Sequence, residues 1–302
     1  MRRSPPVSES LQAYLARMRE GIDRELACRL PPADAYPPKI HEAIRYTLML
    51  GGKRLRPILT LTVGSLFGAR EEDVVPSACA LELVHTASLI LDDLPCMDNA
   101  TLRRGRAVCH RVYGEATAIL AAIALLNRAF GLVAEESSEG RHGDRLARRI
   151  AQRLSAAIGP AGVVGGQHVD LESTGKRLDF ETLEYIHSHK TGSLFICAAE
   201  IGALIGGARR SEMDAIALYA KNLGLAFQVT DDLLDHSGTP SVTGKDAGLD
   251  RDKTTFVSFA GPAGARHLVD ELIDASLASL EPFRGRAERL ADLAELVRKR
   301  DR

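Results

Sequence analysis

Apolar residues fill long stretches of the chain, and short groups of glycine, proline and polar residues separate them. Between these breaks lie intervals that suit helices of roughly 12 to 25 residues, about ten in all. Alternating β-branched runs bounded by tight hairpin turns are absent, so the pattern predicts an all-α protein. The main breaks are Pro31-Pro32, Gly51-Gly52, Pro76, Pro95, Ser137 to Gly143, Gly159 to Gly166, Gly206-Gly207 and Gly238 to Gly248.

The same pattern predicts a single domain over residues 1–302, with residues 1–8 disordered. No stretch has the composition of an interdomain linker, and no short repeat recurs along the chain. The chain has 302 residues and is 45% hydrophobic, enough for a substantial core. Its longest apolar run, Ala116 to Leu126, is shorter than the roughly 20 residues that a membrane span needs, so we expect a buried core helix there.

Charge and cysteine content narrow the classes of partner. The 39 basic and 40 acidic residues nearly cancel, which gives no reason to expect a nucleic-acid or membrane-surface partner. The five cysteines are odd in number and lack paired spacing, which argues against a disulfide framework or a zinc site. Residues 1–8 hold no apolar stretch of the kind found in a secretory signal. We therefore expect a cytoplasmic protein.

Two acidic clusters that read almost alike follow apolar, helix-like runs. The first contains Asp92, Asp93 and Asp98, and the second begins at Asp231 and ends at Asp235. Carboxylates at the end of an apolar helix carry a desolvation cost unless a cation lies opposite them. Carboxylate oxygens are the ligands that Mg²⁺ prefers, and Mg²⁺ shares its other positions with water and phosphate. The clusters therefore predict a magnesium-diphosphate site between two helices.

Helical spacing supports this interpretation in both clusters. At about 100° per residue, Gln228 shares one stripe with the acids of the second cluster. A solvated helix face is the plain alternative, but such a face normally mixes acids with lysine or arginine. Upstream of the first cluster, His85, Ser88 and Asp92 fall at i, i+3 and i+7. A single histidine in an apolar helix is more often a hydrogen-bonded core residue, although its place two turns before Asp92 favours a function.

Basic residues complete the set of candidate groups. Lys53, Arg54 and Arg56 follow a glycine pair, and Arg103 and Arg104 follow the first acidic cluster. Either group alone is usually a solvated surface. Their place beside acids in a chain of nearly neutral charge indicates instead two phosphate sites, one bridged by metal and one paired directly with cations.

Seven motifs follow one another along the chain: Gly51 to Pro57, Asp92 to Asp98, Leu102 to Gly105, Gly165-Gly166-Gln167, Lys190-Thr191-Gly192, Phe227-Gln228 and Asp231 to Asp235. In this order and spacing they resemble the short-chain trans-polyprenyl diphosphate synthases over roughly residues 40 to 260. The resemblance implies that family's isoprenoid synthase fold, an all-α bundle around a deep central cavity, usually in a homodimer.

The resemblance implies a head-to-tail condensation of isopentenyl diphosphate with an allylic diphosphate. Three Mg²⁺ ions, for which Mn²⁺ is expected to substitute, would be held by Asp92, Asp98 and Asp231 with support from Asp93 and Asp235. The implied allylic-site residues are Arg103, Lys190, Thr191, Gln228, Lys245 and Lys253. The implied isopentenyl diphosphate ligands are Gly52, Lys53, Arg56, His85 and Arg104.

Product length depends on the depth of the expected cavity. Ala87 and Ser88 stand where relatives that stop at fifteen carbons often place an aromatic ring, so we expect an open channel. Together with Leu91 and Ile123, this resembles the bacterial geranylgeranyl diphosphate synthases, with farnesyl diphosphate synthase as the alternative. Candidates for the floor of the channel are Leu81, Val84, Ile123 and Leu126.

Two further alternatives remain open at this stage. A terpene cyclase or a head-to-head coupling enzyme would also use opposed acidic clusters, but it would not need the element from Gly51 to Arg56. A non-catalytic partner subunit of a prenyl synthase tends to lose an acidic motif or the lysines, and this sequence retains both.

Overall fold

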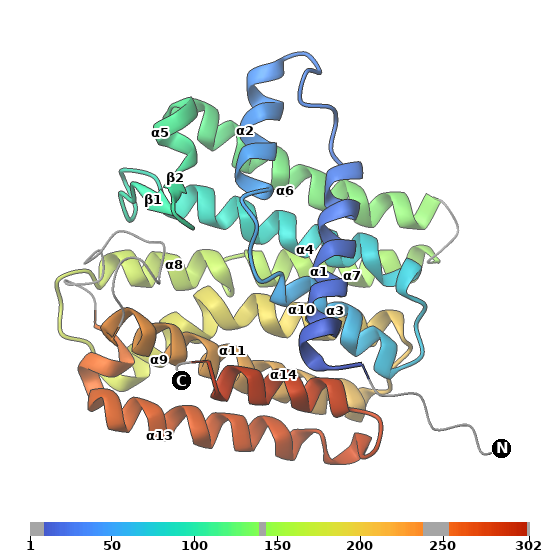
Figure 1. The fold of residues 1–302 in the computed structure, drawn as a ribbon, viewed down its shortest axis with the longest axis vertical. Coiled ribbons are helices and arrows are strands. Elements are labelled where there is room, and N and C mark those ends of the chain that lie inside the picture. The colour runs from blue at the N-terminus through green and yellow to red at the C-terminus, as the bar shows by residue number, and fades with distance from the viewer. Residues whose placement is uncertain (1–8, 139–142, 238–253, 301–302) are drawn as a thin grey trace.

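The computed structural model describes residues 9–138, 143–237 and 254–300, which are almost entirely helical (Figure 1). This confirms the predicted all-α class. The amino-terminal residues 1–8 fall outside the described part of the chain, so their expected disorder stays a prediction. The helices are α1 (Leu11–Cys28), α2 (Pro38–Leu48), α3 (Leu55–Leu66), α4 (Glu71–Asp92), α5 (Cys109–Tyr113), α6 (Glu115–Ser138), α7 (Asp144–Ile158), α8 (Val163–Glu172), α9 (Phe180–His187), η1 (Ser188–Gly192), α10 (Ser193–Ile205), α11 (Arg210–Ser237), α13 (Phe256–Ser279), η2 (Glu281–Phe283) and α14 (Glu288–Arg298).

Several helices begin where a polar side chain caps the first turn. Ser10 accepts a hydrogen bond from the Ala13 N–H at the start of α1, and Asp179 does the same for Thr182 in α9. Thr255 and Ser258 form a reciprocal capping box at the start of α13. Such caps satisfy N–H groups that have no partner inside the helix. They therefore fix where the elements near the site begin.

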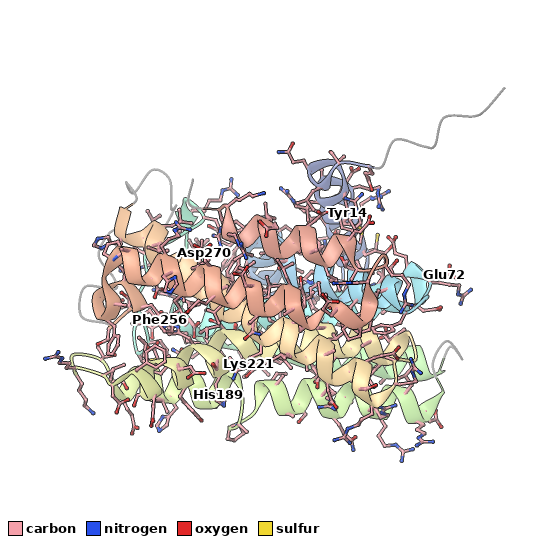
Figure 2. The ribbon with its side chains drawn as sticks, turned by 90° about the horizontal axis from the view of Figure 1, so that it is seen from below. Tyr14, Glu72, His189, Lys221, Phe256 and Asp270 are labelled. Carbon is pink, nitrogen blue, oxygen red and sulfur yellow. The ribbon has the colours of Figure 1, made fainter. Side chains whose placement is uncertain are left out.

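Helix α4 is the centre of the bundle and packs against α3, α6 and α10. Its side chains are buried on nearly every face from Val74 to Ile90, as expected for a helix enclosed by others. Close packing between α3 and α10 depends on Gly202, because a Cβ there would lie 2.3 Å from the carbonyl oxygen of Thr60. On the other side of the bundle, α13 lies along α11 (Figure 2).

Several features differ from the sequence predictions, and Pro76, expected to separate two helices, lies inside α4. A two-stranded hairpin, β1 (Leu102–Arg103) and β2 (Arg106–Ala107), interrupts the helices, although no hairpin was expected. Its strands have only two residues each, too few to produce an alternating pattern. The run from Ala116 is helical but buried on one side only, because Ile119, Leu120 and Ile123 are exposed in α6.

Two described helices, α4 and α6, are long and apolar enough to cross a membrane by length and composition alone. Of the apolar window in α4, 72% is buried inside the bundle, which is typical of a core helix, whereas 39% of the window in α6 is buried. The remaining surface of α6 is therefore available to a partner.

The described hollows do not correspond to the deep cavity that the family resemblance implied. One of about 510 Å³ lies against α1 and Met49, and another of about 290 Å³ lies between Tyr14, α3 and the start of α14. Neither is lined by an acidic-motif residue. The predicted substrate channel therefore stays a prediction.

Candidate active site

The first acidic motif lies where α4 ends. Asp92 is the last helical residue, and the chain then turns so that the Asp98 N–H donates to the Asp92 carbonyl at 2.9 Å. Pro95 stands inside this turn. Burial raises the pKa of Asp92, the neighbouring Asp98 raises it further, and the positive charge of Lys190 opposes the rise. A cation beside Asp92 and Asp98 would relieve both destabilising effects.

Asp93 is only 2% exposed and has a different environment. Arg103 donates from Nε and Nη2 to its carboxylate at 2.6 to 3.0 Å. Burial raises the pKa of Asp93, and the hydrogen bonds from Arg103 oppose that rise. Arg103 is held in place by the hairpin, whose central residues Arg104 and Gly105 both have positive φ, the type I′ pattern. The pair therefore attaches the hairpin to the end of α4.

The second acidic motif lies inside α11, which continues to Ser237. Asp231 is half-buried and pairs with Arg300, which follows α14, at 2.6 Å. The Arg300 guanidinium also lies 4.4 Å from the centre of the Phe227 ring. Asp235 is exposed one turn further along. The acids that share one stripe in the sequence thus have unequal surroundings.

Asp232 belongs to a chain of hydrogen bonds that crosses three elements. The Thr191 hydroxyl donates to Gln228 Oε1 at 3.0 Å, and Gln228 Nε2 donates to Asp232 at 3.0 Å. The other Asp232 oxygen accepts from the Phe256 N–H at 3.1 Å, at the start of α13, where Phe256 is labelled in Figure 2. This arrangement connects the predicted allylic-site residues Thr191 and Gln228.

Lys190 lies in η1, a π-helical turn of five residues between α9 and α10. Its ammonium group donates to Asp170 in α8 at 2.8 Å. The two elements approach closely because residue 166 is glycine: a Cβ at Gly166 would lie 2.3 Å from the backbone nitrogen of Lys190. The motif from Gly165 to Gln167 therefore has a packing role, and Asp170 is a site residue that sequence reasoning missed.

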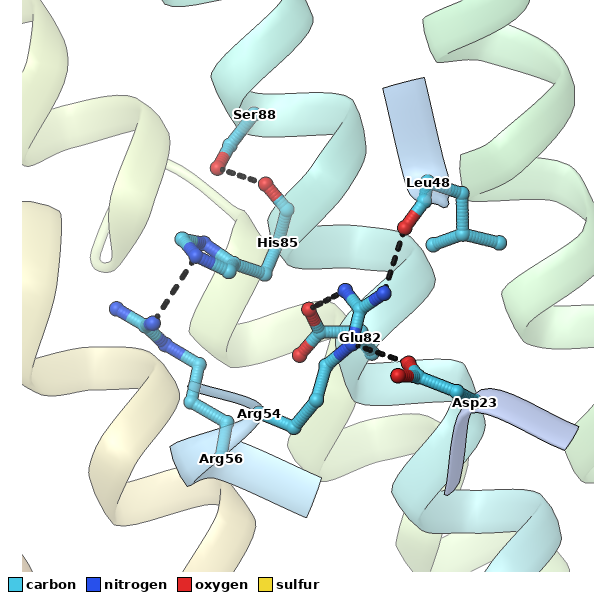
Figure 3. Close-up of polar contacts among 7 residues, drawn as sticks. All are labelled: Asp23, Leu48, Arg54, Arg56, Glu82, His85 and Ser88. Atoms are coloured by element: carbon cyan, nitrogen blue, oxygen red, sulfur yellow. Dashed lines mark hydrogen bonds and ion pairs between the residues drawn. The ribbon is translucent and has the colours of Figure 1, made fainter. Parts of the chain in front are cut away.

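The predicted metal-free phosphate residues gather between α3, α4 and the hairpin. The Arg104 guanidinium lies against Gly52, where a Cβ would come within 2.7 Å of it. Arg56 is hydrogen bonded to His85 Nε2 at 3.2 Å (Figure 3). Lys53 is exposed, and its ammonium lies 5.7 Å from the centre of the Phe227 ring.

Electrostatics around this group favour an anion. Desolvation lowers the pKa of Arg56 to about 10, with the charge of Arg104 adding to the shift and Glu82 and Asp231 opposing it. Desolvation and the charges of Arg56 and Arg104 also keep the pKa of His85 well below its usual range, so the imidazole is neutral at physiological pH. The group consists of clustered cations beside a neutral histidine, which suits a diphosphate without metal.

The remaining predicted residues lie in several places. Ala87 is fully buried in α4, and the Ser88 hydroxyl donates to the His85 carbonyl at 2.8 Å. Ile123 is 55% exposed, so it does not line an interior channel of the single chain. The predicted allylic-site lysines Lys245 and Lys253 lie outside the described residues.

In the described part of the chain, no three acidic, histidine or cysteine side chains are grouped closely enough to hold a metal ion. The donor chemistry nevertheless fits Mg²⁺ on one side, because burial and the nearby charge of Asp98 make an ionised Asp92 unfavourable without a cation. On the other side Arg300 pairs with Asp231. A shared metal would therefore need Arg300 to leave Asp231.

Comparisons with known proteins agree with this geometry. The polyprenyl synthetase family profile matches residues 37–265. The chain is 40% identical to a farnesyl diphosphate synthase of Geobacillus stearothermophilus, covering 97% of this chain and 98% of the relative. It is 42% identical to a chloroplastic geranylgeranyl pyrophosphate synthase of Capsicum annuum, covering 88% and 72%.

Solved structures give the same answer. A geranyltransferase from Helicobacter pylori, complexed with magnesium and isoprenyl diphosphate, aligns with a TM-score of 0.85 at 28% identity, covering 97% of this chain and 98% of that one. The fold is therefore the all-α isoprenoid synthase fold. The chain belongs to the polyprenyl synthetase family and is a prenyltransferase of its trans-prenyl diphosphate synthases.

Proposed function

We propose that this protein is a Mg²⁺-dependent synthase that condenses isopentenyl diphosphate head-to-tail with allylic diphosphates and makes mainly geranylgeranyl diphosphate. The observation that carries the proposal is the arrangement along α4. Its last residue, Asp92, stands beside Asp98 and near the charge of Lys190, while His85, two turns earlier, contacts Arg56. One helix thus carries a site suited to metal and diphosphate and a second site suited to diphosphate alone.

The allylic diphosphate belongs at the acidic motifs. Asp92, Asp98 and Asp231 would hold Mg²⁺, with Asp93 and Asp235 in support, and the metal would supply Lewis-acid stabilisation of the leaving diphosphate. Arg103 and Lys190 lie where their positive charges can stabilise the negative charge that grows as the allylic C–O bond breaks. Gln228, oriented by Thr191 and Asp232, would assist at the same group through hydrogen bonds.

Isopentenyl diphosphate belongs at Gly52, Lys53, Arg56, His85 and Arg104. These residues hold its diphosphate so that its double bond faces the allylic carbon. As that C–O bond breaks, the double-bond electrons form the new C–C bond and leave a cation on the isopentenyl unit. Loss of a proton from that unit to the released diphosphate then restores a double bond. Charge and atoms balance without any further reactant.

The chain-length proposal rests on Ala87 and Ser88 in α4. Their small side chains would leave a channel at this position unobstructed where an aromatic ring would block it, which supports a twenty-carbon product. Relatives include both farnesyl and geranylgeranyl synthases, so product analysis is decisive. Ala87→Phe should shift the main product to farnesyl diphosphate while total condensation is largely preserved, because a ring in a packed wall is not easily accommodated. An unchanged product spectrum would contradict the depth argument.

We also propose that the protein acts as a cytoplasmic homodimer. Ile119, Leu120 and Ile123 form an exposed apolar strip along α6, and Val112 in α5 is exposed nearby in the sequence. An unpartnered apolar strip on a helix at the edge of the bundle favours a second copy of the chain. Sedimentation of the purified protein tests this, and Leu120→Glu should release monomers.

The decisive experiment incubates the purified protein with labelled isopentenyl diphosphate, Mg²⁺ and, separately, dimethylallyl, geranyl and farnesyl diphosphates. Chain-length analysis of the products is expected to give mainly the twenty-carbon diphosphate. Cyclised or head-to-head products would favour the cyclase alternative. A folded protein without turnover that stimulates an added synthase would favour the partner-subunit alternative. A metal chelator should abolish turnover.

A further inference from the structure

Arg54 lies in the sequence between Lys53 and Arg56, two of the cations assigned to isopentenyl diphosphate, yet it cannot itself contact a substrate at the surface. Its side chain is 0% exposed, whereas Lys53, its neighbour in the chain, is exposed. Sequence reasoning counted Arg54 in the basic cluster and gave it no role. Because the side chain is buried, its role depends on the groups with which it pairs.

The Arg54 guanidinium donates in three directions (Figure 3). Nη1 donates to Glu82 in α4 at 2.6 Å, Nε donates to Asp23 in α1 at 2.8 Å, and Nη2 donates to the carbonyl oxygen of Leu48, the last residue of α2, at 2.6 Å. The Glu82 side chain is 3% exposed. One buried side chain therefore connects α1, α2 and α4 at the start of α3.

The Leu48 contact closes the base of the loop that carries Gly52 and Lys53. Within this loop Gly51 and Gly52 have φ of 81° and 144°. Arg54 itself has φ of 51°, in the left-handed region, which few non-glycine residues adopt. Surrounding contacts must hold such a conformation in place. The three donated hydrogen bonds supply that constraint.

Arg54 and Arg56 both bond to α4, so α3 and α4 are joined by two parallel contacts. Arg54 pairs with Glu82, and Arg56 pairs with His85. Glu82 and His85 are three residues apart and therefore lie on one face of α4. Arg54 precedes α3 as its N-cap, and Arg56 is the second residue of that helix. The buried contact thus fixes the position of the contact that faces the site.

We propose that Arg54 and Glu82 form a positioning pair for the isopentenyl diphosphate subsite, holding the loop with Lys53 and the Arg56–His85 contact in binding geometry. The proposal rests on the proposed function. Glu82 also supplies a negative charge close to Arg56, which otherwise repels Arg104. Without Glu82, the opposite charges left beside these arginines would be the partly exposed Asp23 at Arg54 and the partly exposed Asp231 near Arg56.

The test separates positioning from stability. Removing one partner of a buried ion pair leaves an uncompensated charge, whereas replacing both with apolar residues of similar size is often tolerated. The informative variant is therefore the double substitution Arg54→Met and Glu82→Met. Thermal unfolding checks the fold, and steady-state kinetics give kcat and a separate KM for each substrate. Calorimetry with isopentenyl diphosphate in the absence of Mg²⁺ measures the subsite directly.

We expect KM and Kd for isopentenyl diphosphate to rise about tenfold or more, because misplaced cations lose charge-assisted hydrogen bonds. The KM for the allylic diphosphate and kcat at saturation should change less than about threefold, because Asp92 and its neighbours are untouched. A folded double variant with isopentenyl diphosphate KM within about twofold of the unchanged protein would overturn the proposal. An equal rise in both KM values would do the same.

Arg54→Lys provides a second variant in case the double substitution does not fold. Lysine keeps the charge opposite Glu82 but cannot donate in the same three fixed directions. Its isopentenyl diphosphate KM should rise about threefold or more with the allylic KM unchanged, and no rise would overturn the proposal.

The control is the more exposed Arg153–Glu200 ion pair between α7 and α10, at 3.1 Å. Arg153→Met with Glu200→Met should leave the ratio of the two KM values unchanged, whatever its effect on stability. If the unchanged protein fails to condense isopentenyl diphosphate with any primer, the proposed function fails. If the unchanged protein is active but the variant with Arg54→Met and Glu82→Met shows the same unchanged ratio of KM values as the control, the positioning role fails and the proposed function stands.

Discussion

The two acidic motifs have nearly identical sequences, but they lie in different structural environments. The first ends a helix, so the chain folds back and the Asp98 N–H reaches the Asp92 carbonyl. The second lies within α11, which continues past Asp235 and leaves that residue exposed. A turn gathers carboxylates, whereas a continuing helix spreads them over successive turns. The first motif is therefore the better preformed half of the proposed metal site.

In one respect the motifs agree. In each motif one aspartate accepts hydrogen bonds from neighbouring elements. Asp93 accepts from Arg103, and Asp232 accepts from Gln228 and the Phe256 N–H. These two side chains are the buried members, at 2% and 8% exposure. We therefore propose that adjacent aspartates in such a motif divide between a metal-ligand role and a supporting role. Four predictions test this division.

The largest effect is expected at the leading aspartates. Asp92→Ala and Asp231→Ala should each lower kcat by about a thousandfold or more at saturating Mg²⁺, because they remove charge stabilisation that matters most in the transition state. Both variants should keep the helical circular dichroism of the unchanged protein. Near-normal turnover in either one would contradict the proposed metal site.

Asp235 provides the contrast within the second motif. Because it is exposed and one turn further along α11, Asp235→Ala should lower kcat far less, about tenfold or less. Parallel measurements on Asp98→Ala, in the folded-back first motif, should give the larger loss. Equal losses of kcat in Asp98→Ala and Asp235→Ala would show that the turn at the end of α4 does not make the first motif more important than the second.

A smaller effect, on stability, is expected at Asp232. Asp232→Ala leaves the Phe256 N–H and the Gln228 amide without their acceptor, which should lower the free energy of unfolding by about 2 kcal/mol. Urea denaturation followed by circular dichroism measures this change. Asp235→Ala serves as the exposed control and should change the same quantity by less than about 0.5 kcal/mol.

The smallest effect concerns Arg300. Its ion pair with Asp231 would compete with the proposed metal for the same carboxylate. Arg300→Gln should therefore lower the Mg²⁺ concentration that half-saturates the protein by about threefold, as expected for a partly screened pair. Calorimetric titration with Mg²⁺ and an unreactive allylic diphosphate analogue provides the readout. Weaker Mg²⁺ binding in the variant would show that Arg300 supports the site.

Sequence patterns predict the helical class and the common face of the residues before the first motif, because both features depend on local spacing. His85, Ser88 and Asp92 do lie along one half-buried face of α4. The patterns could not identify Asp170 or Arg300, since each acquires its role from a partner at least 20 positions away, Lys190 and Asp231 respectively. An arginine or aspartate in a sequence does not indicate whether tertiary packing will bury it.

The apolar run in α6 differs from the predicted buried core helix for a related reason. Composition indicates that a helix avoids water, but not whether its own chain or a second copy covers it. Only part of that helix is buried in the single chain, and Ile123 is exposed. Lys245 and Lys253 lie outside the described residues, so their predicted contacts remain predictions.

Helix α4 also fixes the distance between the two proposed substrate sites. His85 and Asp92 are seven residues apart on one continuous helix, which sets them about 10 Å apart along its axis. If the two substrates bind at these two levels, the distance between their diphosphates is a property of hydrogen-bonded backbone and not of loop length. A single residue inserted between them would turn the acidic end by about 100°. Insertions and deletions that preserve this geometry must therefore lie outside the segment from His85 to Asp92.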